Sequence, residues 1–161
     1  MSNKERKQKI AQLSSQLNIS TFDRVTMNVE EIISLDRRGF EIGAHTHSHT
    51  ILSAEKINDC RDEIKTSNTI LENIIGKKIK YFAFPNGSFD IDFNSQHRAL
   101  IKELGFEAAF STNDGGCFND SNLFSLSRFM TIKNTLPFFA LSIATIAHER
   151  SKKDERNLVK L

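Results

Sequence analysis

The amino-acid sequence predicts an α/β protein with a mostly parallel β-sheet. Stretches with apolar residues at helical spacing alternate with short apolar runs that are typical of buried strands. Glycine follows three of the expected helices, where a left-handed residue ends a helix without strain. Polar loops come directly after two of the expected strands, which is where chemistry collects in parallel sheets. At 161 residues the chain is long enough to bury one core as a single domain, 1–161.

The first half of the chain contains three expected helices and one expected strand. The first helix is polar with a weak apolar stripe, and the second has Asn28 as N-cap with Glu31 at the capping-box position. The third is expected to start from Ser53 as its cap. In order, the elements are a helix over 3–17, a helix from Asn28 to Gly39, a strand over 40–44 and a helix from Ser53 to Gly76.

The second half alternates in the same way and ends in a charged tail. Pro85 cuts the first of its strands, because proline cannot donate to a ladder of hydrogen bonds. The expected elements are a strand over 81–84, a helix over 94–104 before Gly105, a strand over 106–110, a loop over 113–116, a strand over 126–132, a helix from Thr135 or Pro137 to Ile146, and the tail 147–161.

Composition excludes several classes of function. A net charge of +2, with the basic residues mainly at the two ends, does not provide the basic face of a nucleic-acid-binding domain. Cys60 and Cys117 lack the CxxC spacing of a zinc cluster and could form one disulfide or remain two isolated buried thiols. No apolar run follows the basic start or reaches the length of a membrane span, so the chain as given is expected to be cytoplasmic.

Three histidines follow the strand expected at 40–44. If the chain turns helically there, His45 and His49 lie on one face and can bind one divalent cation, while His47 points elsewhere. Neutral imidazole suits Zn²⁺, and Co²⁺, Ni²⁺ or Fe²⁺ can compete for such a site. A third ligand, most plausibly a carboxylate, has to come from elsewhere. Spacing alone would favour a polar surface loop over a metal site.

The residues around the histidines carry a resemblance to a known family. Residues 39–49, together with Leu52, closely resemble the second motif of the polysaccharide deacetylases, the NodB-homology group of carbohydrate esterases. That motif reads H-[ST]-x-x-H. The resemblance implies that His45 and His49 bind the metal and that Thr46 braces the loop.

A second stretch, residues 82–90, looks like the third motif of the same family. The resemblance implies that this loop forms a wall of the active site, with Phe84, Pro85, Asn86 and Gly87 contacting substrate. It also implies that the backbone N–H of Asn86 helps to hold the oxyanion of the tetrahedral intermediate. Asn86 replaces the usual aromatic residue, so a surface for stacking on sugar is lost. The composition of this loop would also fit a plain turn at the end of a strand.

The later part of the chain resembles the family more weakly. Residues 111–116 and 124–129 are similar to a loop and a strand that carries an arginine, which implies that Arg128 orients groups beneath the site; an ordinary arginine at a strand end is the alternative. His148 superficially matches the late histidine that protonates the leaving amine, although a surface histidine fits its charged surroundings. His97 has no partner in view and is expected at the surface. The resemblance covers residues 14–146.

The first motif of the family, T-F-D-D, is missing. Residues 21–24 imitate it, but Arg24 stands where the ligand aspartate belongs and the preceding residues do not form a buried strand. The resemblance therefore implies a partial, distorted (β/α) barrel without its first strand or strands, either from a truncated reading frame or as a natural remnant. Export of the parent protein remains open, and an open sheet edge predicts self-association.

The function implied by the resemblance is metal-dependent hydrolysis of N-acetyl groups of an amino-sugar polysaccharide, impaired in this chain because the paired aspartates are absent. Two alternatives belong to other classes of protein. One is a non-catalytic remnant that binds carbohydrate or a protein partner through the same groove. The other is an unrelated α/β metal-binding protein.

Overall fold

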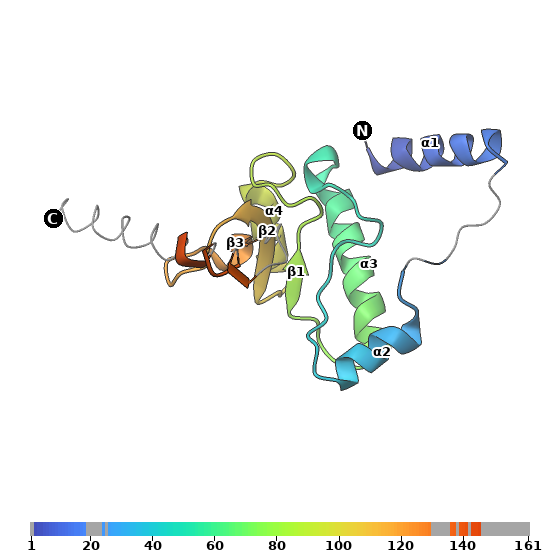
Figure 1. Ribbon diagram of the computed structural model, residues 1–161. Coiled ribbons are helices and arrows are strands. Elements are labelled where there is room, and N and C mark those ends of the chain that lie inside the picture. Colours follow the sequence, from blue (N-terminus) through green and yellow to red (C-terminus); the bar gives the residue numbers. More distant parts are fainter. Residues whose placement is uncertain are drawn as a thin grey trace.

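The computed structural model describes residues 2–18, 24, 26–129, 136–137, 139–141 and 143–145. Its centre is a parallel three-stranded sheet in the order β1-β2-β3 (Figure 1). The strands are β1 (Tyr81–Ala83), β2 (Ala108–Asp114) and β3 (Leu126–Arg128). Tyr81 pairs with Ala108, and Phe110 pairs with Leu126. The predicted α/β architecture with a parallel sheet is therefore confirmed.

The strand expected at 40–44 contacts the sheet at a single residue. Ala44 forms an isolated parallel bridge with Phe82, in which its N–H donates to Tyr81 O at 2.9 Å and its carbonyl accepts from Ala83 N–H at 2.9 Å. The start of the segment belongs instead to the end of the preceding helix, because Phe40 N–H donates to Leu35 O. The chain therefore joins the edge of β1 only as it reaches the histidines.

The described residues form four α-helices, and the capping is as predicted at the start of α2 and at the end of α3. Asn28 caps α2 and Glu31 returns the capping-box hydrogen bond, as predicted. Gly76 ends α3 in the left-handed conformation, with φ of 71°. The helices are α1 (Asn3–Gln16), α2 (Val29–Arg37), α3 (Ile57–Ile75) and α4 (Ser95–Glu103), and two short 3₁₀ helices are η1 (Leu52–Ala54) and η2 (Leu123–Ser125).

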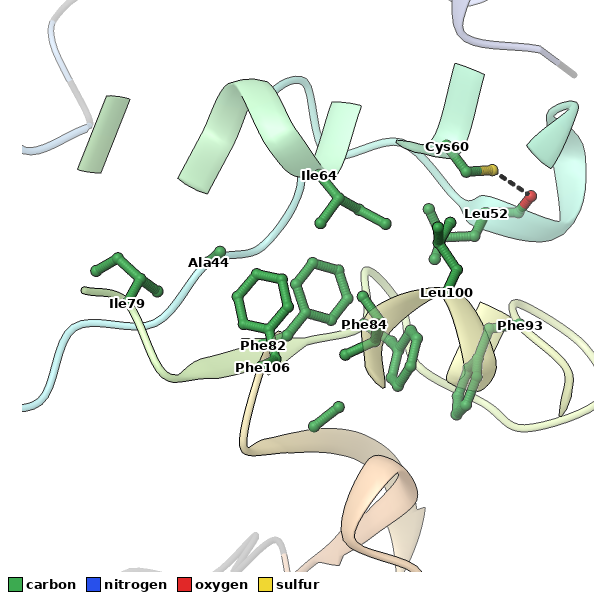
Figure 2. Close-up of a cluster of buried hydrophobic side chains, with 12 residues drawn as sticks. Ala44, Leu52, Cys60, Ile64, Ile79, Phe82, Phe84, Phe93, Leu100 and Phe106 are labelled. Carbon is green, nitrogen blue, oxygen red and sulfur yellow. Dashed lines mark hydrogen bonds between the residues drawn. The ribbon is translucent and has the colours of Figure 1, made fainter. Parts of the chain in front are cut away.

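The hydrophobic core lies between β1, α3 and α4 (Figure 2). Phenylalanine dominates it: the rings of Phe84 and Phe93 stack with centroids 3.6 Å apart, and Phe82 meets Phe84 edge to face at 5.1 Å. α3 contributes Cys60 and Ile64 to the same cluster. The cluster consists of Ala44, Leu52, Cys60, Ile64, Ile79, Phe82, Phe84, Phe93, Leu100, Ile101, Phe106 and Ala109.

The start of α3 differs from the prediction. Ser53 does not cap it; the helix begins at Ile57, and Lys56 is the N-cap residue without a side-chain hydrogen bond. Leu52 explains the difference, because η1 directs this side chain into the core, where it is 1% exposed. Ser53 N–H is used in a hydrogen bond to Asp92 O, so the residue is held in the turn that precedes the helix.

β2 begins two residues later than predicted and extends to Asp114, into the loop expected at 113–116. Phe106 packs into the core before the strand starts, and Asp114 still pairs with Arg128 of β3. β3 is seen from Leu126 to Arg128, whereas residues 130–132 of the predicted strand lie outside the described part.

Three side-chain expectations can also be compared with the structure. Both cysteines are free thiols. The prediction of two buried thiols is confirmed for Cys60, which is buried, and wrong for Cys117, which is exposed. His97 was expected at the surface and is instead 5% exposed, because its Nδ1 accepts the N–H of Asn94 at the start of α4.

Within the described residues, no helix is both long and apolar enough to cross a membrane. The tail 147–161 lies outside the described residues.

Candidate functional site

Two loops begin side by side, one after the bridge residue Ala44 and one after β1. The histidine loop (residues 45–50) follows the bridge at Ala44, and the proline loop (residues 84–90) follows β1, which pairs with Ala44. Both loops contain residues with positive φ that are not glycine: Thr46 and His49 in the first, Asn86 and Asp90 in the second. Among described residues only Asn18 shares this property. Positive φ is unfavourable for residues other than glycine, and such conformations are often found at functional sites.

His45 is held by a hydrogen bond that also sets its tautomer. Its Nδ1 lies 2.7 Å from the carbonyl oxygen of Ala83, and since a carbonyl can only accept, Nδ1 carries the proton. Nε2 therefore keeps a lone pair, which is the usual arrangement of a metal-binding histidine. Burial lowers the pKa of His45; the bond to Ala83 opposes this, and the charges of His49 and Arg128 lower it further. The ring stays neutral and able to donate its lone pair.

His49 lies beside His45, and Thr46 braces the turn between them. The two imidazole centroids are 4.9 Å apart with an interplanar angle of 76°. The buried Thr46 accepts the N–H of Thr50 through its Oγ1 at 3.0 Å, which closes the loop. His47 is exposed, and its N–H donates to Glu63 O.

Glu63 of α3 is a residue of this site that sequence reasoning missed. Its carboxylate accepts the backbone N–H of Ser48 at 2.8 Å and the Ser48 hydroxyl at 2.7 Å. Burial raises the pKa of Glu63, but the hydrogen bonds from Ser48 and Thr50 and the nearby His47 outweigh it, so that the pKa is lowered overall. A charged Glu63 thus ties the histidine loop to α3. The only signal in the sequence is an acid beside Ile64 on the buried side of a predicted helix.

The proline loop is held by β2. Gly87 N–H donates to Pro85 O at 2.7 Å, which makes a tight turn around Asn86. Thr112 N–H donates to Gly87 O at 2.8 Å, and the Thr112 hydroxyl donates to Asn86 O at 2.5 Å. Both carbonyls therefore point toward β2. In the described part of the chain, the Asn86 N–H has no acceptor.

The four residues expected to contact substrate differ in exposure. Asn86 is exposed, whereas Phe84, Pro85 and Gly87 are buried. Phe84 belongs to the core, where it stacks on Phe93. The surface that this loop presents is therefore the side chain and backbone of Asn86.

Arg128 lies at the end of β3, and its Nε donates to Ser111 O at 2.6 Å. Its effect on the pKa of His45 indicates that its charge lies near the histidine loop. His148 and residues 21–23 lie outside the described residues.

The donor set fits only part of the metal site that the histidine motif implies. Two imidazoles at this separation, one of them with Nε2 free, suit a borderline divalent cation as two of its ligands. Over the described residues, no group of three or more His, Cys, Asp or Glu side chains is arranged to hold a metal ion. The residues thus fit half of a metal site.

Comparisons with known proteins identify a family and a fold. Residues 14–109, more than half of the chain, match the family model described as polysaccharide deacetylase. No curated protein sequence matches the chain.

Fifteen chains among the solved structures match this one, and two of them illustrate the likeness. One is the deacetylase PplD from Streptococcus pyogenes in complex with acetate, with 17% identity and a TM-score of 0.66 over 83% of this chain and 54% of that protein. The other is a polysaccharide deacetylase from Bacillus cereus, with 24% identity and a TM-score of 0.63 over 73% of this chain and 37% of that protein. The chain therefore spans about half or less of the length of each.

Proposed function

Because the chain belongs to the polysaccharide deacetylase family, we propose that it carries part of a metal-dependent site that hydrolyses N-acetyl groups of an amino-sugar polysaccharide. The observation that carries the proposal is the pair of imidazoles whose centroids lie 4.9 Å apart, with the His45 tautomer set for metal binding. Zn²⁺ is the metal that this donor type favours, with Co²⁺, Ni²⁺ or Fe²⁺ as competitors.

In the proposed reaction, His45 and His49 hold the cation. When bound, the metal would polarise the acyl carbonyl and activate water. A metal-binding imidazole has to be neutral, and burial lowers the pKa of His45, which favours a ring whose Nε2 carries no proton.

The proline loop supplies a donor for the charge that develops on the acyl oxygen. The Asn86 N–H is suited to this role because the carbonyl of its own peptide, Pro85 O, accepts the Gly87 N–H, while Thr112 donates to the two carbonyls that follow. These hydrogen bonds fix the peptide planes of the turn. The exposed Asn86 side chain offers an amide to the hydroxyl and acetamido groups of a sugar. Phe84, Pro85 and Gly87 support this turn from the buried side. Arg128 and His148 remain candidates for an orienting cation and a general acid.

We further propose that the activity of this chain alone is low. Residues 21–24 imitate the first motif of the family, but Arg24 takes the place of the ligand aspartate and the preceding residues do not read as a buried strand, so we assign neither a base nor a carboxylate ligand there. Loss of one general base lowers a rate by about 10²–10⁴-fold, and a weaker metal site adds to this loss. Self-association of the chain through an exposed sheet edge is part of the same proposal.

Metal binding tests the proposal directly. Wild type, His45→Ala, His49→Ala and the matched control His47→Ala are titrated with Zn²⁺ by calorimetry and with Co²⁺ by visible absorption. We expect one ion per chain on wild type and on His47→Ala, and weaker binding of at least about tenfold in the other two variants. Acetate release from N-acetylglucosamine oligomers is then measured with the metal present.

Two results would contradict the proposal. If wild type binds no stoichiometric metal and His45→Ala changes nothing, the enzymatic interpretation of this chain fails. Retained binding of the oligomers in that case would favour the alternative, a non-catalytic carbohydrate-binding remnant. If His47→Ala loses the metal as completely as His45→Ala, the assignment of ligands is wrong.

A further inference from the structure

The two imidazoles of the half-site are held in different ways. The ring of His45 is fixed by its own hydrogen bond to Ala83 O. His49 is exposed, and within the described residues its ring makes no hydrogen bond. The position of the His49 ring therefore depends on its backbone, which has a φ of 54°. Whatever holds that backbone also determines how well the second ligand is placed.

Arg6 of α1 holds the backbone on both sides of His49. Its Nη1 donates to His49 O at 3.2 Å, and its Nη2 donates to Ser48 O. The Ser48 carbonyl belongs to the peptide before the His49 Cα and the His49 carbonyl to the peptide after it. One planar guanidinium thus fixes both peptide planes that set φ and ψ of His49.

Asn3 connects this arginine to the carboxylate of Glu63. Its Oδ1 accepts from Arg6 Nη2 at 3.0 Å, and its Nδ2 donates to Ser48 Oγ at 2.6 Å and to Glu63 Oε1 at 3.1 Å. Asn3 N–H donates to the carboxylate of Glu55. The first turn of α1 is therefore hydrogen-bonded to two acidic side chains and to the histidine loop.

The contact between α1 and the loop is polar. No described residue of α1 is buried, and its apolar side chains Ile10, Leu13 and Leu17 are exposed. The N-terminal end of the helix, which carries partial positive charge, faces Glu55 and Glu63. Figure 1 shows that only this end of α1 approaches the rest of the chain. The attachment can therefore be weakened without removing core packing.

We propose that Arg6, oriented by Asn3, is a positioning residue that holds His49 ready for the metal. This inference rests on the proposed metal-binding function of His45 and His49. Both Asn3 and Arg6 precede residue 14, where the match to the family model begins, so this contact is an addition to the part of the chain that the family model describes. Release of α1 would leave the fold intact and one ligand poorly placed.

The test compares Arg6→Ala with Arg6→Lys and with Lys9→Ala, a change of charge elsewhere on the exposed face of α1. Zn²⁺ affinity is measured by calorimetry, and hydrogen exchange of the Ser48 and Thr50 amides is measured on metal-free protein. We expect Arg6→Ala to weaken Zn²⁺ binding about tenfold, as loss of a group that orients a ligand does. We expect those amides to exchange about fivefold faster, corresponding to the loss of one hydrogen bond.

Arg6→Lys keeps the charge but cannot reach both carbonyls, so it should restore only part of the affinity. Lys9→Ala should behave as wild type in both measurements. Circular dichroism and thermal unfolding establish that each variant is folded under the conditions of the titration.

The outcomes separate this inference from the proposed function. If wild type binds Zn²⁺ and Arg6→Ala binds it equally well, the positioning role is refuted while the metal site stands. If wild type binds no Zn²⁺, the proposed function fails and the role toward the metal fails with it. An equal loss of affinity in Lys9→Ala would show a general effect of charge and would also overturn the inference.

Discussion

Replacement of Gly87 by alanine should destabilise the chain far more than the same change at Gly39. Both glycines have similar positive φ values, 82° at Gly87 and 86° at Gly39. An added Cβ at Gly87 would lie 2.9 Å from Phe84 O, 3.0 Å from Thr112 N and 3.2 Å from Thr112 Cγ2. At Gly39 an added Cβ would have no atom within 4 Å. The pair therefore separates the cost of a backbone conformation from the cost of a steric clash.

The expected magnitudes follow from these distances. Left-handed backbone destabilises an alanine by about 1 kcal/mol at either position, and the entropic effect on the unfolded chain is the same for both. At Gly87 the closest atoms belong to the backbone, so the loop has to shift, which adds about 1–3 kcal/mol. We expect a loss in the free energy of unfolding of about 1 kcal/mol for Gly39→Ala and about 3 kcal/mol for Gly87→Ala.

Urea unfolding followed by circular dichroism measures both variants against wild type. Equal losses at the two glycines would refute the reasoning, because the clash with Phe84 and Thr112 would then have no energetic consequence. A change in the slope of the unfolding transition would indicate an altered unfolded state and would have to be excluded first.

Three further predictions concern the core, a buried histidine and α1. Phe84→Ala should lower the free energy of unfolding by about 3–5 kcal/mol, because it leaves a cavity in the core. The side chain of Ile91 is 71% exposed, so Ile91→Ala should change this free energy by less than about 0.5 kcal/mol. Urea unfolding measures both variants, and equal losses would contradict the prediction. Burial lowers the pKa of His97, so the unfolded chain binds a proton before the folded chain does as pH falls below about 6.5, and stability should decrease there. His97→Gln can still accept the Asn94 N–H and should show a smaller decrease. Unfolding titrations between neutral and acidic pH measure the difference. An unchanged pH profile in His97→Gln would argue against this account. Raising the salt concentration from about 0.05 to about 0.5 M should speed hydrogen exchange of the Ser48 amide, because α1 is attached by polar contacts; exchange independent of salt would contradict that description.

The fold was predictable where it depends on local pattern. The capping box of Asn28 and Glu31, the end of α3 at Gly76 and the order of helices and strands follow from residues close together in the sequence. The start of α3 was not, because it depends on the burial of Leu52 in a core built by distant segments. The burial of His97 has the same kind of cause, since Asn94 gives its ring nitrogen a partner only when α4 forms.

The candidate site was predictable only in its ligands. The spacing of His45 and His49 indicates that they can meet, and the structure brings their rings together through positive φ at Thr46 and His49 instead of through a helical turn. The groups that hold the loop come from far away: Glu63 lies 15 positions from Ser48, and Arg6 lies 43 positions from His49. No periodicity or motif connects residues at such separations.

The position of Glu63 next to Ile64 on α3 has a consequence for how the molecule unfolds. Ile64 is fully buried among the phenylalanines (Figure 2), while its neighbour Glu63 holds the backbone of Ser48 in the histidine loop. The loop and the core thus share one rigid helix. While α1 is attached, a loop held in this way should lose its protection from hydrogen exchange together with the core amides of α3, as one cooperative unit.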